Sequence, residues 1–462
     1  MLAFRVCKMP ELIDRPVAAT VMKMAIPMLA GTFATNMYQL TDAWMVSRLG
    51  TEALAAISFT FPVIMFFSFL IRGLGTGTMT LVAHALGGDD RAGATTLIYH
   101  AILLAGLIAL VLMTAGLISL KPLFNALGAS GSVLVRVEEY MKIWYMGCMI
   151  MILQMVTSDV IFATGNTGVM SALMVGGTVV NIIFDYVLIF GKYGFPRLEM
   201  AGAALATLIA QTMVLVAALV ILRKKMGLLH RRGHEVSILS SWSKIMAFSI
   251  PGSLGMVATP VSAAIVTRLV AEYGHAAVAA TGVAGRIEMF AFMIPMAVGM
   301  SLIPFIAQNF GANRMDRIRE ARRGTMIFAV LYGVFIGAVF IASAGSMARV
   351  FSSDASVVEV LRSYIYITCA GYGMMEVHRY AGFCMTGTNQ PFKASMLNVF
   401  RALVLLIPLS LMGNHLFKLN GIFGARCLTD LLAGMIGIWW SGRMLKRVQN
   451  QMRTVQSQDS QP

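Results

Sequence analysis

Charged side chains are scarce in this sequence. Asp, Glu, Lys and Arg together make up 12% of its 462 residues, whereas an average soluble domain has about 25%. Hydrophobic residues account for 58% of the chain, and the mean hydropathy is +0.76. A soluble domain does not need so much apolar surface, so the composition excludes one and indicates a protein embedded in a membrane.

Motifs for metal, nucleotide and covalent chemistry are also lacking. The seven histidines show no ligand spacing, and the chain has no P-loop, Gly-rich phosphate cradle or nucleophile elbow. We therefore expect no metal site, no cofactor and no enzyme activity. The five cysteines have neither paired nor metal-like spacing and are interpreted as reduced thiols, mostly buried: Cys7, Cys148, Cys369, Cys384 and Cys427.

Long apolar runs are abundant instead. A helix needs roughly 20 apolar residues to cross a bilayer, and about twelve runs qualify, so the predicted fold is an all-α integral membrane protein. Polar residues within the first run favour a retained spanning helix over a cleaved signal peptide. The segments are 18–47, 53–82, 94–119, 138–163, 168–190, 199–222, 243–271, 277–308, 324–347, 358–385, 394–412 and 421–442.

The net charge of +15 is concentrated in alternate loops. This distribution follows the positive-inside rule, so it indicates topology rather than nucleic-acid binding. We expect a multi-pass protein of the cell (inner) membrane, surrounded by lipid, with both termini in the cytoplasm. The main basic groups are Arg223, Lys224, Lys225, Arg231 and Arg232; Arg314, Arg317, Arg319, Arg322 and Arg323; and Arg443, Lys446, Arg447 and Arg453.

An internal repeat organises the chain. Ile26-Pro27 recurs as Ile250-Pro251, and the same register pairs Gly50 with Gly274; further on, Gly165 pairs with Gly387. The repeat predicts two pseudo-symmetric six-helix bundles, an N-lobe at 1–225 and a C-lobe at 242–462 with a basic tail, joined by a cytoplasmic linker at 226–241. Because both halves begin in the cytoplasm, the repeats are parallel, and a cavity between them is the expected place for substrate.

Several segments resemble the multidrug and toxic compound extrusion (MATE) family. They include 49–56, 181–185, 202–207, 308–312 and 421–425, while 286–288 and 398–401 are similar to stretches of its DinF-like branch. The resemblance implies a polyspecific exporter with V-shaped halves that alternate between outward-open and inward-open states. Inward flow of protons or sodium ions would drive it.

Acidic residues inside apolar segments are the candidates for chemistry. An ionised Asp near a helix centre costs about 2.5 to 3.5 kcal/mol on insertion scales, so Asp42 and Asp185 indicate a polar cavity. Tyr38 lies four residues before Asp42 and Asn181 four before Asp185, so each pair shares a helix face. The resemblance assigns these four residues, with Thr207, to an ion-coupling cavity in the N-lobe.

Structural roles remain open for the same residues. Tyr38 and Thr207 could be ordinary packing contacts, Asn181 an interhelical hydrogen bond, and the two acids protonated groups with structural bonds. Asp159 departs from the family pattern, in which amide residues are common there. It could join the cavity or lie towards the aqueous end of its helix.

The second half lacks matching acids. Val266 and Ile407 stand at the repeat positions of Asp42 and Asp185, so ion coupling is expected in the first half. The resemblance implies an acid in the middle of the seventh predicted segment in sodium-coupled members of the family, but residues 257–261 contain none, which disfavours a sodium site there. The remaining polar candidates of this half are expected mainly to form structural ion pairs; they are Arg286, Glu288, Glu376, His378 and Arg379.

The predicted function is secondary active export of organic cations or other xenobiotics by antiport, with protons preferred to sodium. Thirty-seven methionines provide adaptable apolar surface for such substrates. Pro27, in the same segment as Asp42, is the expected hinge. We expect a monomer. The alternatives are a flippase of the same superfamily for a lipid-linked precursor and an exporter of one dedicated metabolite.

Overall fold

The computed structural model describes residues 10–229, 236–351 and 354–459, and almost all of them are helical. The predicted apolar segments all lie in these helices, which confirms an all-α membrane protein. Among the described residues, ten helices are long and apolar enough to span a membrane, and the last of them, 391–452, contains two predicted segments. Segments 277–308 and 358–385 are each divided into shorter helices.

The chain divides into two compact units. Unit 1 comprises Met1–Leu12 and Lys23–Ser253, and unit 2 comprises Ile13–Met22 and Leu254–Pro462. The division falls within α8 (Ile238–Ala271) rather than in the linker expected at 226–241. Residues 230–235 of that linker lie outside the described residues.

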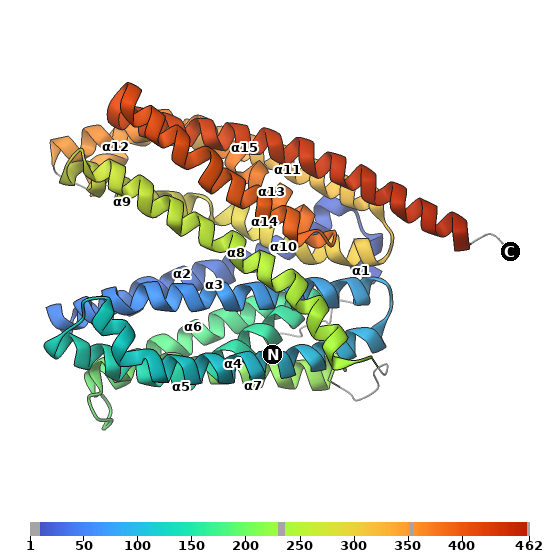
Figure 1. Ribbon diagram of the computed structural model, residues 1–462, viewed down its shortest axis with the longest axis horizontal. Helices are drawn as coiled ribbons and strands as arrows, with labels where there is room; N and C mark the ends of the chain where they lie inside the picture. Colours follow the sequence, from blue (N-terminus) through green and yellow to red (C-terminus); the bar gives the residue numbers. More distant parts are fainter. Residues whose placement is uncertain (1–9, 230–235, 352–353, 460–462) are drawn as a thin grey trace. The chain divides into compact units, whose positions relative to one another are not determined.

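Unit 1 is built around α5, which packs against α3, α4 and α7, while α6 packs on α7 (Figure 1). Phe67 of α3 contacts Trp144 and Tyr145 of α5, with ring centroids 5.6 and 5.7 Å apart. Gly116 lets α4 approach the Tyr145 ring closely. The bounds are α1 (Pro10–Asp14), α2 (Val17–Ser47), α3 (Thr51–Gly87), α4 (Arg91–Ala126), α5 (Gly131–Ala163), α6 (Thr167–Phe190), α7 (Glu199–Val220) and the π-helix η1 (Ile221–Lys225).

Unit 2 is built around α13, which packs against α10, α11 and α15. Tyr372 is buried between Phe292 and Phe340, with ring centroids 5.0 and 5.9 Å away. The bounds are α9 (His275–Ala291), α10 (Met293–Gly311), α11 (Met315–Phe351), α12 (Ala355–Thr368), the 3-10 turn η2 (Cys369–Gly371), α13 (Tyr372–Gly387), α14 (Pro391–Val399), the π-helix η3 (Phe400–Leu406) and α15 (Ile407–Asp459).

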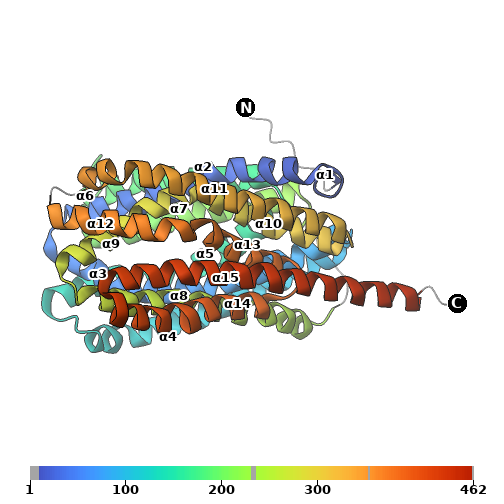
Figure 2. The same cartoon turned by 90° about the horizontal axis from the view of Figure 1, so that it is seen from above.

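A chain reversal interrupts α15. Phe417 and Lys418 have non-helical dihedral angles, and Lys418 has a φ of 53°, which is unusual for a residue with a Cβ. The reversal separates a short limb from the long C-terminal limb, drawn in red in Figure 2. Gly413 and Gly421 lie backbone to backbone across it. Since neither has a side chain, the two limbs can touch directly.

Because of this contact, we expect a side chain added at Gly421 to destabilise the protein. Gly421→Ala should lower the stability of the detergent-purified protein by about 1 to 3 kcal/mol, the usual cost of overpacking, because the new Cβ would meet the Gly413 carbonyl. Gly424→Ala is the matched control, since a Cβ there would have no heavy atom within 4 Å. Equal thermal stability of the two variants would contradict the contact.

Candidate functional site

The five predicted coupling residues come from three helices of unit 1. Tyr38 and Asp42 lie on α2, Asn181 and Asp185 on α6, and Thr207 on α7. These helices approach closely at small residues. A Cβ on Gly31 of α2 would meet the Met174 side chain and the Ser171 backbone of α6, and one on Gly202 of α7 would meet the Leu188 backbone.

The close approaches set the register of the site. Tyr38 lies seven residues after Gly31, and Asn181 seven after Met174, which is about two helical turns in each helix. The contact between α2 and α6 therefore repeats two turns later as a pair of polar side chains. Small residues at helix interfaces are a common means of close packing in membranes.

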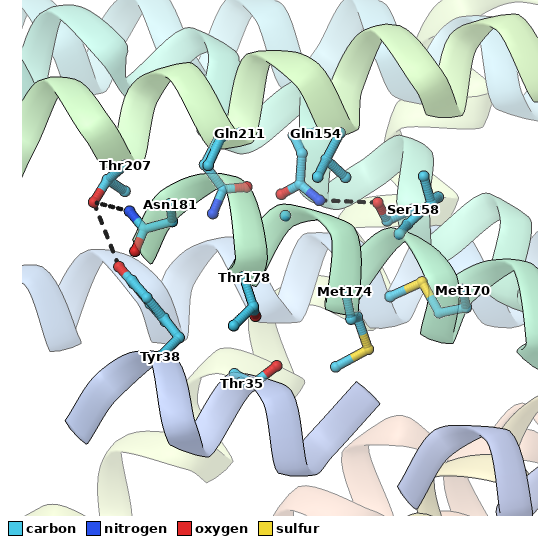
Figure 3. Close-up of a pocket in the computed structure, with 14 residues that line it drawn as sticks. Thr35, Tyr38, Gln154, Ser158, Met170, Met174, Thr178, Asn181, Thr207 and Gln211 are labelled. Carbon is cyan, nitrogen blue, oxygen red and sulfur yellow. Dashed lines mark hydrogen bonds between the residues drawn. The ribbon is translucent and has the colours of Figure 1, made fainter. Parts of the chain in front are cut away.

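A chain of hydrogen bonds joins the three helices at this level. Tyr38 Oη lies 3.5 Å from Thr207 Oγ1. In the amide orientation drawn in Figure 3, Asn181 Nδ2 donates to Thr207 Oγ1 at 3.4 Å. With the amide turned by 180°, Nδ2 donates to Asp185 Oδ2 at 2.7 Å, and Oδ1 accepts from Thr207 N at 3.2 Å. The second orientation satisfies both ends of the amide.

The two acids are incompletely satisfied. Asp185 is fully buried, and within the described residues Asp185 Oδ1 and Asp42 Oδ1 have no hydrogen-bond partner. The two carboxyl groups lie within electrostatic reach of each other. Buried polar atoms in folded proteins are usually bonded, so two orphaned oxygens on neighbouring acids indicate a site that binds a proton or a ligand.

Tyr140 belongs to the same cluster, although the sequence did not indicate it. This α5 side chain lies within electrostatic reach of Tyr38, Asp42 and Asp185. It follows two glutamates at the start of predicted segment 138–163, where a residue is expected to lie near the aqueous end of a span.

A cavity of about 150 Å³ begins at the Tyr38, Asn181 and Thr207 end of this cluster. Its lining comes from α2, α5, α6 and α7, as Figure 3 shows, and contains polar but uncharged side chains. Gln154 Nε2 donates to Ser158 Oγ at 2.9 Å on one wall. The complete lining is Thr35, Tyr38, Gln154, Ser158, Met170, Leu173, Met174, Gly177, Thr178, Asn181, Thr207, Ala210, Gln211 and Val214.

Some of the polar residues that line the cavity could have been predicted from helical spacing. Thr35 lies three residues before Tyr38, Thr178 three before Asn181, and Gln211 four after Thr207. Extending each polar stripe by one turn towards the cavity predicts all three. Gln154 and Ser158 also lie four apart, but no predicted site residue on α5 pointed to them.

Asp159 lies against α3. A Cβ on Gly75 would meet its Oδ2 atom, and its electrostatic partner is Arg72, also on α3. Asp159 is not among the residues that line the cavity, whereas its neighbour Ser158 is. The cavity lining therefore does not include Asp159, for which joining the cavity was one of the alternatives left open.

In the second half, the buried acids lie in ion pairs, although both carboxyl oxygens of Glu376 and His378 Nδ1 have no hydrogen-bond partner within the described residues. Glu288 accepts hydrogen bonds from Tyr364 Oη at 2.9 Å and Tyr372 Oη at 3.1 Å, and Arg426 lies 2.6 Å from its other oxygen. Arg286, the nearer basic residue in sequence, is exposed on α9. The sequence did not indicate Arg426, because it lies far along the chain.

Two further groups complete the charged region. Glu376 and Arg379 form an ion pair at 3.1 Å along α13, and His378 is buried between them in sequence. Arg401 pairs with Asp430, neither of which was among the candidates. In 10–229, 236–351 and 354–459, no three His, Cys, Asp or Glu side chains are grouped as metal ligands would be.

Known proteins match this chain over both halves. The MatE family model covers residues 27–187 and 251–412. A Shewanella oneidensis protein named FAD transporter is 31% identical and aligns with 95% of this chain and 97% of its own. Multidrug export protein MepA of Staphylococcus aureus is 25% identical, with 91% and 92% covered. The crystal structure of the Vibrio cholerae MATE transporter VcmN in the bent form has a TM-score of 0.88, 25% identity and coverage of 94% and 98%.

The hydrogen bonds between Asn181 and Asp185 predict different effects of substitution at these two positions on the stability of the protein. Asp185→Asn should leave thermal stability of the purified protein nearly unchanged, because the amide keeps the shape of a protonated carboxyl. Asn181→Ala should cost about 1 to 3 kcal/mol, because it leaves Asp185 Oδ2 without its donor in a buried site. A larger loss in Asp185→Asn than in Asn181→Ala would contradict the assignment.

Proposed function

This chain belongs to the multidrug and toxic compound extrusion (MATE) family, and we propose that it is a secondary active exporter that moves small organic molecules out of the cell against an inward flow of protons. One observation carries this proposal. Asp42 and Asp185, both with an orphaned oxygen, lie beside an uncharged polar cavity. Asn181, which lines the cavity, can donate to Asp185, and Tyr38, which also lines it, shares a face of α2 with Asp42.

A carboxyl group in this position favours exchange of a proton for a cation. An ionised acid in a site of low dielectric is costly unless a positive charge neutralises it. Either a proton or a bound organic cation can do so, and each makes the other less favourable. Binding of one therefore promotes release of the other, which is the requirement for antiport.

The orientation of the Asn181 amide depends on whether Asp185 carries a proton. When Asp185 is ionised, the Asn181 amide donates to it; when Asp185 is protonated, its hydroxyl can donate to the Asn181 oxygen, and the amide turns over. In the orientation drawn in Figure 3, Asn181 Nδ2 donates to Thr207 Oγ1, which lies beside Tyr38 Oη. Proton binding at α6 is thereby transmitted to α2 and α7.

The cavity suits substrates of varied shape. Met170 and Met174 provide flexible apolar surface, and the amides of Gln154 and Gln211 can donate or accept hydrogen bonds. We propose organic cations and other xenobiotics as the main substrate class. Protons are preferred to sodium as the coupling ion because residues 257–261 provide no acid.

Pro27 lies inside α2, fifteen residues before Asp42, and has no N–H to donate to the preceding turn. It is proposed as the hinge at which α2 bends when Asp42 changes its protonation state. We further propose a monomer in the cell (inner) membrane, with both termini in the cytoplasm, as the distribution of basic loops favours.

A second candidate is export of one dedicated metabolite. The observation that favours it is the 31% identity to a protein named FAD transporter over nearly the whole chain. FAD is an organic anion, whereas the first-half cavity has acids beside it. A lipid-linked precursor flippase is less well supported, since such proteins usually carry extra helices.

Proton coupling predicts that Asp42→Asn and Asp185→Asn abolish pH-driven dye export. Each change removes the titratable group and nearly preserves its shape. Ethidium accumulation in a host deficient in pumps should rise to the level of cells without the protein, at equal expression. Ile407→Ala, at the repeat position of Asp185, is the control and should export normally. Wild-type export by both Asn variants would exclude the acids from coupling.

The hinge predicts that Pro27→Ala weakens pH-driven export while dye binding to the purified protein is retained. An uninterrupted helix would lack the flexible point. Spin labels on α6 and on the part of α2 that follows Pro27, both in unit 1, should change their separation between pH 5.5 and pH 8 in the wild type and much less in Pro27→Ala. The same change in both proteins, or in Asp42→Asn, would rule out a protonation-driven bend.

A further inference from the structure

A second cavity lies entirely within unit 2. It has a volume of about 340 Å³, within the range of sites for small organic ligands. Helices α8, α9, α12 and α15 and the π-helix η3 surround it. The lining combines two arginines, Arg401 and Arg426, with two aromatic rings, several hydroxyl groups and aliphatic side chains.

The charged residues that line this cavity are both arginines. Arg426 pairs with Glu288 at 2.6 Å, and Arg401 pairs with Asp430 at 2.5 Å. Neither acid is part of the lining. The side chains of Arg426 and Arg401 are 27% and 15% exposed, whereas those of Glu288 and Asp430 are 11% and 3% exposed. Both ion pairs are therefore oriented with the positive end towards the cavity.

The two acids are already engaged on their buried side. Glu288 accepts from Tyr364, Tyr372 and Arg426, and Asp430 Oδ1 accepts both Nε and Nη2 of Arg401. A guanidinium group has five N–H donors. Hydrogen bonds among the described residues account for one bond from Arg426 and two from Arg401. Donors thus remain on the cavity side of each arginine.

The rest of the lining favours a ligand that combines an anionic group with a flat apolar part. Thr259, Ser262, Thr267 and Thr281 contribute hydroxyl groups, which donate readily to phosphate or carboxylate oxygens. Tyr364 and Phe423 pack edge to face with centroids 5.0 Å apart, and Arg426 lies over Tyr364 at 5.4 Å. Both rings belong to the cavity lining, so the flat apolar part of a ligand would meet an aromatic wall.

We propose that this cavity of unit 2 binds small aromatic organic anions of the phosphate-bearing class, held by Arg401 and Arg426. As a substrate site, it rests on the export function proposed above and supplies the chemistry that the first-half cavity lacks for the dedicated-metabolite candidate. Ion pairs that served only to join helices would not need their positive ends on a cavity rich in hydroxyl groups.

The test is equilibrium binding of flavins to the full-length protein purified in detergent, with no ion gradient. FMN and riboflavin share one aromatic ring system and differ by a phosphate group. FMN should bind at least about tenfold more tightly, since charge-assisted hydrogen bonds to guanidinium are among the strong ones. Equal affinity for the two flavins would overturn the proposal.

Matched variants separate an anion site from a structural ion pair. Arg426→Gln combined with Glu288→Gln leaves the net charge unchanged and should abolish the preference for FMN. Glu288→Gln alone removes the countercharge from Arg426 and should tighten FMN binding. Arg286→Gln removes a positive charge from the exposed face of α9, two residues from Glu288, and should have no effect.

Each measurement either supports or overturns the proposed anion site. A preference for FMN that survives the double variant, or weaker FMN binding in Glu288→Gln, would overturn the site; the single variant keeps the test valid if the double variant does not fold. Asp42→Asn should retain the wild-type preference for FMN. Failure of proton-coupled export and failure of anion binding are thereby measured independently.

Discussion

A polar group in the membrane interior has no water to bond, and this constraint governs the whole molecule. Backbone groups are satisfied by helices throughout the described chain. Many hydroxyl side chains follow the same rule: Thr32 and Thr35 of α2, for example, donate to carbonyl groups of the preceding turn. Among the acidic side chains of the first half, Asp42 and Asp185 each have one carboxyl oxygen with no hydrogen-bond partner within the described residues. The two carboxyl groups interact electrostatically, and they are the basis of the proposed coupling.

The two halves of the repeat place different charged groups in the membrane interior. In the first half, acids stand beside an uncharged polar cavity. In the second half, Val266 and Ile407 stand at the positions that correspond to the acids. The charged residues that line the cavity of this half are Arg401 and Arg426, and the acids paired with them are more deeply buried. The duplicated scaffold would thus serve the two tasks proposed above, proton exchange in one bundle and recognition of charged ligands in the other.

Sequence patterns could predict what depends on neighbours along one helix. The apolar segments and the pairs Tyr38 with Asp42 and Asn181 with Asp185 follow directly from length and helical period. Partners supplied by distant helices could not be predicted in this way. Arg286 and Glu288 are two residues apart and so point to different faces of α9, while the true partner of Glu288, Arg426, lies 138 positions away. Tyr140 was missed for the same reason, since only the packing of α5 brings it to the acids.

The π-helix η3, Phe400–Leu406, carries one of the two cavity arginines. A π turn is equivalent to one residue inserted into an α-helix, and such turns are frequent at functional sites. Deleting a single residue here would restore a regular helix, yet it would rotate Arg401 by about 100° relative to the helix that follows. The ion pair with Asp430 would then be lost without any change in the apolar character of the segment. Chain length, rather than residue type alone, is therefore part of the recognition chemistry proposed for this bundle, and relatives that differ by one residue in this turn should differ in the ligands they accept.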